Sequence, residues 1–458
     1  MKAKKTAVFL FAMCYVSLIH ANVENPVVNG SEKAINENET ITAYFSSYLT
    51  GKVSTFNQSK KIKLGDTETV RKKVWTAWQE ANRCFTEEKL ITLLPLANGK
   101  SGQWHLPANL EPDAVMSYYW GTKGESPSSG YPFYLYLHGS GPKTMEWQIG
   151  LTICNNFQDA PSVYFIPQIP NEGEYYRWWQ RSKQFAWEKL LRQALVSGQV
   201  DPDRIYMFGI SEGGYGSQRL CSFYADYLAA AGPMAGGEPL KNAPAENCRN
   251  IAFSLRTGEK DMGFYRNILT RYIKAEFDSL QTYNPDGFKH WVELVPAMGH
   301  AIDYSSTPLW LKKHIRNPYP KQVSWEDFEM DGKHRKGFYN IYVDKRPEGA
   351  ERTYYEMKID GNTINLTVQA VNYEVIQKDP RWGIEMKFKK CYTSAGGGRL
   401  TLYLCDELVD LSKPIILRVN GKKVFVGKVK PDLKHLVNSC TAFFDPRRIY
   451  PAAVEIVY

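Results

Sequence analysis

Short apolar runs alternate with amphipathic stretches through the middle of this chain. The runs expected to be strands are 114–120, 133–137, 162–166, 205–208, 227–232, 251–255 and 291–295. Between them, residues 182–197 carry apolar side chains at helical spacing. Strands that alternate with helices are typical of a mostly parallel sheet covered on both faces. The pattern predicts an α/β core in residues 111–318.

After about residue 320 the helical periodicity fades and short strands follow one another. The expected strands are 340–343, 354–359, 363–368, 400–404, 415–419, 423–426 and 454–458. Asp360-Gly361 and Asn420-Gly421 are tight-turn signals between neighbouring strands. This spacing predicts a C-terminal all-β, sandwich-like domain in residues 320–458.

An extension precedes the core. Residues 22–65 are polar and are expected to be irregular, and Asp66 is a candidate N-cap for a helix that runs to Cys84. The apolar residues of this helix are Val70, Val74, Trp75 and Trp78. Residues 22–110 are therefore expected to be an N-terminal extension whose helix packs on the core.

The first 21 residues have the pattern of a signal peptide. Lys2, Lys4 and Lys5 precede an apolar run at 6–19, and Ala21 offers a cleavage point. The run is shorter than the roughly 20 residues that span a bilayer, which disfavours an uncleaved membrane anchor. A lipid anchor on Cys14 is disfavoured by the large residue before it. The sequence predicts a secreted or periplasmic protein with no integral membrane segment after signal removal.

Composition agrees with a soluble two-domain protein: 458 residues, 43% of them apolar and 23% charged. The net charge of +9 falls to +6 without the three N-terminal lysines and is spread along the chain, so no nucleic-acid partner is expected. Of 8 cysteines, seven follow the signal segment, and this odd number predicts at least one free or intermolecular thiol. No CxxC pair supports a zinc or redox motif, and the disulfide pairing stays open.

Gly209-Ile210-Ser211-Glu212-Gly213 matches G-x-S-x-G directly after the strand expected at 205–208. In this motif the serine lies on a strained strand-to-helix turn, and the glycines let neighbouring backbone approach closely. A serine hydroxyl needs a base and an orienting acid to become a nucleophile. Ser211 is therefore a candidate nucleophile, in preference to a plain glycine turn.

Candidates for the other two roles follow later strands. Asp261 and Glu259 lie in the loop after the strand at 251–255, and Asp261 is preferred because the pattern that these residues resemble places the acid last in this loop. His300 follows the strand at 291–295 within Met298-Gly299-His300. We expect Asp261 and His300 to meet Ser211 at one edge of the sheet.

His138-Gly139-Ser140-Gly141 ends the strand expected at 133–137. Such a turn leaves backbone N–H groups pointing toward the site, where they can stabilise an oxyanion. Gly139 or Ser140 would supply one N–H group and Glu212 the other. His138 is expected to brace the turn.

These four elements together resemble the α/β-hydrolase superfamily, and in particular secreted esterases and dienelactone-hydrolase-like and prolyl-oligopeptidase-like catalytic domains. The resemblance covers about residues 110–318, in the order oxyanion turn, Ser211, Asp261, His300. It implies a serine hydrolase that needs neither a metal nor an organic cofactor. The long β-propeller of oligopeptidases has no counterpart before the core.

Tyr175, Tyr176, Trp178 and Trp179 lie in the loop before the helix at 182–197. Loops at the carboxyl ends of strands frame the site in open α/β sheets, so these rings are candidates for a substrate-binding platform. Packing against the rest of the chain is the alternative.

The sequence as a whole favours a secreted serine carboxylesterase that acts on carbohydrate-linked esters (acetyl, methyl or feruloyl), with a polysaccharide as the partner. A serine peptidase on the same fold is one rival, and activity on aminoacyl amides would distinguish it. A non-catalytic carbohydrate-binding protein is the other, and a fluorophosphonate probe would distinguish it.

Overall fold

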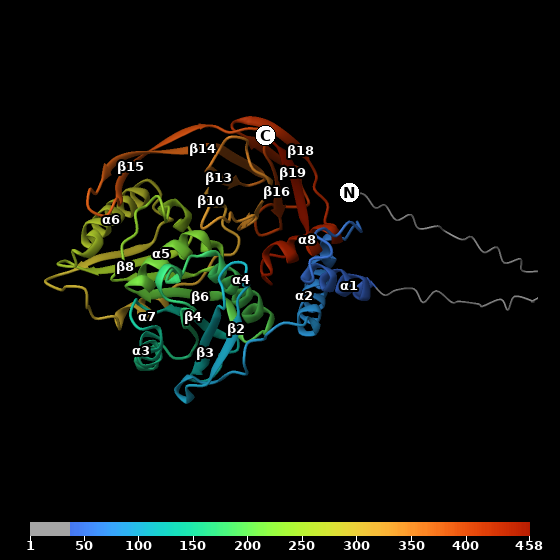
Figure 1. Cartoon of the computed structure of the whole chain (residues 1–458). Coiled ribbons are helices and arrows are strands. Elements are labelled where there is room, and N and C mark those ends of the chain that lie inside the picture. Colours follow the sequence, from blue (N-terminus) through green and yellow to red (C-terminus); the bar gives the residue numbers. More distant parts are fainter. Residues whose placement is uncertain (1–36) are drawn as a thin grey trace, which may run out of the picture. The chain divides into compact units, whose positions relative to one another are not determined.

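The apolar runs of the middle of the chain pair into one mixed, mostly parallel sheet (Figure 1). The computed structural model describes residues 37–458, so the expected signal peptide lies outside the described residues. The strands of this sheet are β1 (Leu94–Pro95), β2 (Ser101–His105), β3 (Val115–Lys123), β4 (Tyr131–Leu137), β5 (Ser162–Pro167), β6 (Val200–Ile210), β7 (Ala230–Met234), β8 (Ala252–Gly258) and β9 (His290–Val295). Their order is β1-β3-β5-β4-β6-β7-β8-β9, with β2 paired to β3. The strands from β5 to β9 are parallel, and β3 is antiparallel to β5.

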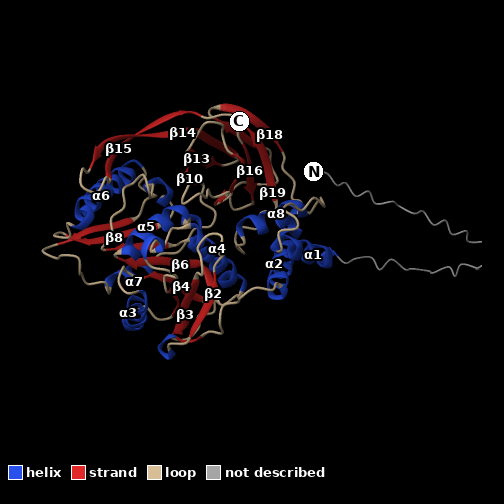
Figure 2. Cartoon of the chain, viewed as in Figure 1, coloured by secondary structure: helices blue, strands red, loops and turns tan. Residues whose placement is uncertain are grey.

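Helices cover both faces of this sheet (Figure 2). Side chains alternate along β4, so Tyr134 and Tyr136 pack on one face, while Phe133 and Leu135 pack on the other. The first face is covered by α3 (Lys143–Asn156) and α7 (Ser306–Leu311), and the second by α4 (Arg181–Val196), α5 (Glu212–Phe223) and α6 (Arg266–Tyr283). The α/β prediction is confirmed.

The C-terminal part is a sandwich of two sheets. One contains β10 (Gln322–Asp327), β13 (Thr353–Asp360), β14 (Thr363–Lys378), β15 (Glu385–Ser394), β17 (Ile415–Val419) and β18 (Lys422–Gly427). The other contains β11 (Gly337–Phe338), β12 (Ile341–Lys345), β16 (Arg399–Leu404) and β19 (Ala452–Val457). Trp325 of the first sheet stacks on Phe338 of the second with 5.2 Å between ring centroids. Asn420 and Gly421 both have positive φ in the tight turn between β17 and β18, as expected.

Two helices differ from the sequence expectation. The expectation of an irregular segment at 22–65 is wrong for α1 (Glu37–Leu49), whose Ile41 and Phe45 lie one helical turn apart and are both buried. A helix, α8 (Leu433–Phe443), also interrupts the strands of the C-terminal part. Together with α2 (Thr67–Cys84), α1 and α8 form their own apolar cluster, which includes the expected contact residues Val74 and Trp78. The short strands β1 and β2 also precede the first strand that was expected.

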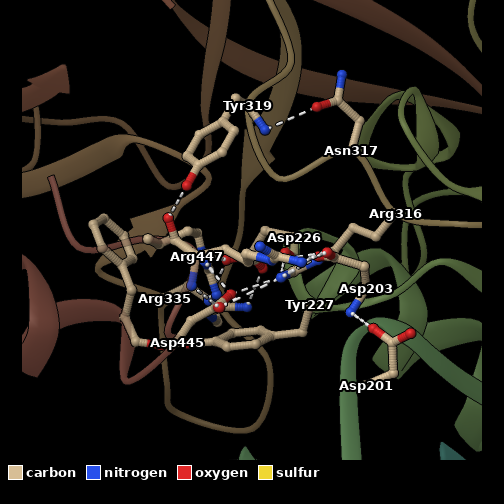
Figure 3. A network of polar contacts seen from close by, with 12 residues as sticks. Asp201, Asp203, Asp226, Tyr227, Arg316, Asn317, Tyr319, Arg335, Asp445 and Arg447 are labelled. Atoms are coloured by element: carbon tan, nitrogen blue, oxygen red, sulfur yellow. Dashed lines mark hydrogen bonds and ion pairs between the residues drawn. The ribbon is translucent and has the colours of Figure 1, made fainter. Parts of the chain in front are cut away.

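A buried network of ion pairs joins the sheet core to the C-terminal part (Figure 3). Asp226, just after α5, accepts hydrogen bonds from Arg335 at 2.8 and 3.0 Å and from Arg448. Asp445 accepts from Arg316 at 2.7 Å and from Arg448 at 2.9 Å. Burial raises the pKa of Asp445, but these guanidinium groups outweigh burial and lower the pKa to about 2. The hydrophobic core is also continuous between the two parts. The division of the chain into domains at 111–318 and 320–458 stays a prediction.

Two further properties hold for residues 37–458. All seven cysteines in this part of the chain are free thiols. The helices described there are too short or too polar to span a membrane.

Candidate active site

Ser211 lies on a strained turn between β6 and α5. Its backbone has φ 57° and ψ −113°, a conformation that residues other than glycine rarely adopt. The Ser211 N–H donates to Met234 O at 3.0 Å, and Ser211 O accepts the N–H of Tyr215, also at 3.0 Å. The end of one strand and the first turn of the next helix therefore hold the serine in this conformation.

Close backbone approach explains the two glycines of the motif. A Cβ atom on Gly209 would lie 2.4 Å from Gly213 O, and one on Gly213 would lie 1.9 Å from Leu137 O. Both clashes are with backbone atoms, which a change of side-chain rotamer cannot relieve. The pattern G-x-S-x-G is thus a steric requirement of this turn.

The structure brings Ser211, His300 and Asp261 into one hydrogen-bonded chain. His300 Nε2 lies 3.0 Å from Ser211 Oγ, and His300 Nδ1 lies 2.7 Å from Asp261 Oδ2. Asp261 is only 3% exposed, whereas the side chain of His300 is 46% exposed. With Nδ1 donating to the carboxylate, Nε2 can accept the serine proton, which is the arrangement that activates a serine nucleophile.

Arg266, which no sequence motif indicated, also binds Asp261. Its Nε donates to Oδ2 at 2.9 Å and its Nη2 donates to Oδ1 at 2.7 Å. Burial raises the pKa of Asp261, but the hydrogen bonds from Arg266 and His300 outweigh burial and leave the pKa below its ordinary value. Asp261 is therefore an anion shared between two cationic partners when His300 is protonated.

The alternative acid, Glu259, has a different partner. Its side chain is exposed on the same loop and accepts the N–H of Ala297 at 3.0 Å. Asp261, and not Glu259, is the carboxylate bonded to His300.

The turn at Gly139 and Ser140 lies against Ser211. A Cβ atom on Gly139 would come within 3.4 Å of Ser211 Cβ, so the backbone of this turn borders the hydroxyl. Glu212 is the first residue of α5, and the first N–H groups of a helix have no acceptor within the helix. The role of these N–H groups in binding an oxyanion stays a prediction.

His138 braces that turn, as expected. It is fully buried, and its Nε2 accepts the N–H of Ile169 at 3.1 Å. Its Nδ1 must then carry the proton and donate to Gly139 O at 2.7 Å. Burial lowers the pKa of His138 to about 4, so the imidazole is neutral near pH 7.

The predicted aromatic platform is wrong for Tyr176 and Trp178, because both side chains are buried. Trp178 is fully buried and donates from Nε1 to His138 O at 3.0 Å, while the hydroxyl of Tyr176, itself buried, donates to Gly139 O at 2.8 Å. These two rings pack against the turn at Gly139 and are too buried to stack on a ligand. Tyr175 is half-buried with Lys183 Nζ 5.7 Å from its ring. Trp179, also half-buried, reaches the space beside Glu212, with Arg219 lying 3.9 Å from its ring.

Within residues 37–458, no group of three or more His, Cys, Asp or Glu side chains is placed to hold a metal ion. The hydrogen-bonded chain of Ser211, His300 and Asp261 is a geometry that can support acyl transfer through the Ser211 hydroxyl.

The sheet topology and the strand–turn–helix unit at Ser211 are those of the α/β-hydrolase fold, which confirms the expected fold class. Comparisons with protein-family models and with curated proteins found no match. Among solved structures, the chain is similar to a thermostable esterase at 19% identity, covering 47% of this chain and 63% of that one, with a TM-score of 0.36. It is also similar to a fluorophosphonate-binding serine hydrolase of Staphylococcus aureus at 13% identity, covering 46% of this chain and 97% of that one, with a TM-score of 0.35. A third similar structure is a ferulic acid esterase of the fungus Anaeromyces mucronatus, at 13% identity, covering 50% of this chain and 91% of that one, with a TM-score of 0.33.

The chain thus spans less than two thirds of the thermostable esterase. These identities and TM-scores are low, so we infer the function from the geometry of the site.

Proposed function

We propose that this protein is an exported serine hydrolase that cleaves carboxylic esters. The observation that carries the proposal is the hydrogen-bonded chain from Ser211 through His300 to the buried Asp261, with Ser211 on a strained turn. A structural serine needs neither that turn nor a histidine oriented by a buried carboxylate.

The reaction follows from the geometry. Ser211 Oγ attacks the ester carbonyl while His300 Nε2 takes its proton, and Asp261 stabilises the imidazolium. The N–H groups of Glu212 and of Gly139 or Ser140 stabilise the negative oxygen of the tetrahedral intermediate. His300 then protonates the leaving alcohol, and the acyl group stays on Ser211. A water molecule, deprotonated by His300, attacks this acyl-enzyme and releases the acid and Ser211.

Esters on carbohydrates are the substrate class that we favour. The signal-like segment at 1–21 favours action outside the cytoplasm, where polysaccharides occur. Acetyl, methyl and feruloyl esters are the candidates.

A labelling experiment tests the reaction type. A fluorophosphonate probe should label the parent protein and a Ser126→Ala control, in which an exposed loop serine is lost, but not Ser211→Ala. Turnover of p-nitrophenyl acetate should fall by several orders of magnitude in Ser211→Ala and in His300→Ala. Labelling that persists in Ser211→Ala would contradict the proposal.

A substrate panel tests the class of ester. The parent protein should release acid from at least one of acetylated, methylated or feruloylated polysaccharides. Faster cleavage of aminoacyl amides than of all these esters would instead identify a peptidase.

A further inference from the structure

A hairpin of the C-terminal part reaches the loop that carries Asp261. Strands β14 and β15 extend away from the rest of their sheet, and β15 lies beside α6 (Figure 1). At the hairpin tip, Asp379 accepts a hydrogen bond from Tyr265 at 2.5 Å, and Trp382 packs on Phe264 with 5.1 Å between ring centroids. The C-terminal part therefore contacts the catalytic loop directly.

The contacted loop segment is strained. Phe264 and Tyr265 both have positive φ, 49° and 60°, between Asp261 and Arg266. Neither is a glycine, and such conformations persist only where the surroundings hold them. The contacts with the hairpin tip supply part of that support.

Between the hairpin tip and the core lies a cavity of about 480 Å³. Glu212, the residue that follows Ser211, lines it. Trp179 and Arg177 border it on the core side, and Trp382 borders it on the hairpin side. A concave site with aromatic walls and a few polar groups is typical of small-ligand binding.

One polar group in this cavity lacks a partner. Glu212 is 8% exposed, and within residues 37–458 its Oε1 has no hydrogen-bond partner. Its other oxygen lies 3.6 Å from Arg177 Nη1, beyond a good hydrogen bond. Buried polar groups in proteins are almost always hydrogen-bonded, so an orphan of this kind calls for a ligand donor. Burial also raises the pKa of Glu212 to about 7.

The cavity mixes charged groups with exposed aromatic surface. Arg219 is already satisfied by Glu238, to which it donates at 2.8 and 3.0 Å, but the side chain of Arg177 is 46% exposed. Trp382 and Phe264 are 51% and 49% exposed at the hairpin contact.

We infer that this cavity binds a sugar unit of the ester substrate and that the β14–β15 hairpin completes the binding site. The inference rests on the proposed ester hydrolase function and assigns a role to the C-terminal part. A sugar hydroxyl can donate to Glu212 Oε1, another can accept from Arg177, and the apolar face of the ring can pack on Trp382. A purely apolar acyl group would leave Glu212 Oε1 without a hydrogen-bond donor.

The test uses the full chain with Trp382→Ala and Glu212→Gln. The matched control is Ile376→Ala, which removes an exposed side chain (58%) from the same hairpin and does not line the cavity. The readout is kcat/KM on acetylated xylotetraose divided by kcat/KM on p-nitrophenyl acetate. We expect this ratio to fall about fivefold or more in each cavity variant.

Calorimetry on Ser211→Ala separates this inference from the proposed function, because binding needs no catalysis. Xylotetraose or mannotetraose should bind Ser211→Ala, and adding Trp382→Ala should weaken binding about fivefold or more. If neither sugar binds, or if Ile376→Ala lowers the ratio as much as Trp382→Ala, the inference is overturned even where p-nitrophenyl acetate is hydrolysed. If sugars bind but no ester is cleaved, the proposed function fails and the sugar site stands.

Discussion

Replacing Asp261 with asparagine removes a charge with little change in shape. The carboxylate is 3% exposed and accepts hydrogen bonds from His300 at 2.7 Å and from Arg266 at 2.7 and 2.9 Å. In the proposed reaction, in which Ser211 gives its proton to His300, Asp261 balances two neighbouring cations. We expect Asp261→Asn to lower kcat about a thousandfold or more, which corresponds to about 4 kcal/mol of transition-state stabilisation.

Arg266 should account for part of that loss, because its charge stays when the carboxylate is gone. Arg266 Nε and His300 Nδ1 both bind Asp261 Oδ2, so they are separated by no more than the sum of the two distances, about 5.6 Å. Two unit charges at that separation repel by about 3 kcal/mol at an effective dielectric constant of about 20. Solvent around the half-exposed His300 reduces this to about 1–2 kcal/mol. Adding Arg266→Gln to Asp261→Asn should therefore raise kcat about 5- to 30-fold.

The assay is hydrolysis of p-nitrophenyl acetate by the parent, Asp261→Asn, Arg266→Gln and the double variant, with melting temperatures measured on the same samples. Glu259→Gln is the matched control, since Glu259 lies in the same loop but is bonded to Ala297. A larger loss in Glu259→Gln than in Asp261→Asn would refute the assignment of the acid. A folded double variant that is no more active than Asp261→Asn would refute the charge argument.

Three further predictions concern stability. Trp178→Ala removes a fully buried side chain and should lower the free energy of unfolding by about 3–5 kcal/mol, measured by urea denaturation. Asp226→Asn removes the negative charge that pairs with the buried Arg335 and Arg448 and should cost about 3–5 kcal/mol in the same assay, whereas Asp410→Asn at the surface should change little. Burial raises the pKa of Glu212 to about 7, so its contribution to stability is present below about pH 4.5 and is lost as the pH rises through 7. Glu212→Gln should therefore be more stable than the parent at pH 8, by about 3 kcal/mol, and should match it near pH 4, as measured by melting curves.

The strands and the turns of the core could be predicted from short segments. A buried parallel strand is a continuous apolar run, and β4, β5 and β8 lie within a few residues of their predicted positions. The distal part of β14 was missed because its side chains are mostly exposed and it pairs only with β15. Helix α1 was missed because its apolar residues are few and become buried only against distant helices.

The sequence by itself determined the site residues whose identity follows from the local backbone geometry. Gly209, Ser211 and Gly213 lie in one turn, and Asp261 and His300 each follow a strand, so local motifs indicate them. Only the tertiary structure decided which long side chains meet: Arg266 on Asp261, Trp178 against the turn at His138 and Gly139, and Trp382 beside a cavity that Glu212 lines. The physical reason is that a turn depends on the conformation of a few neighbouring residues, whereas burial and pairing of a long side chain depend on elements that fold against it from elsewhere in the chain.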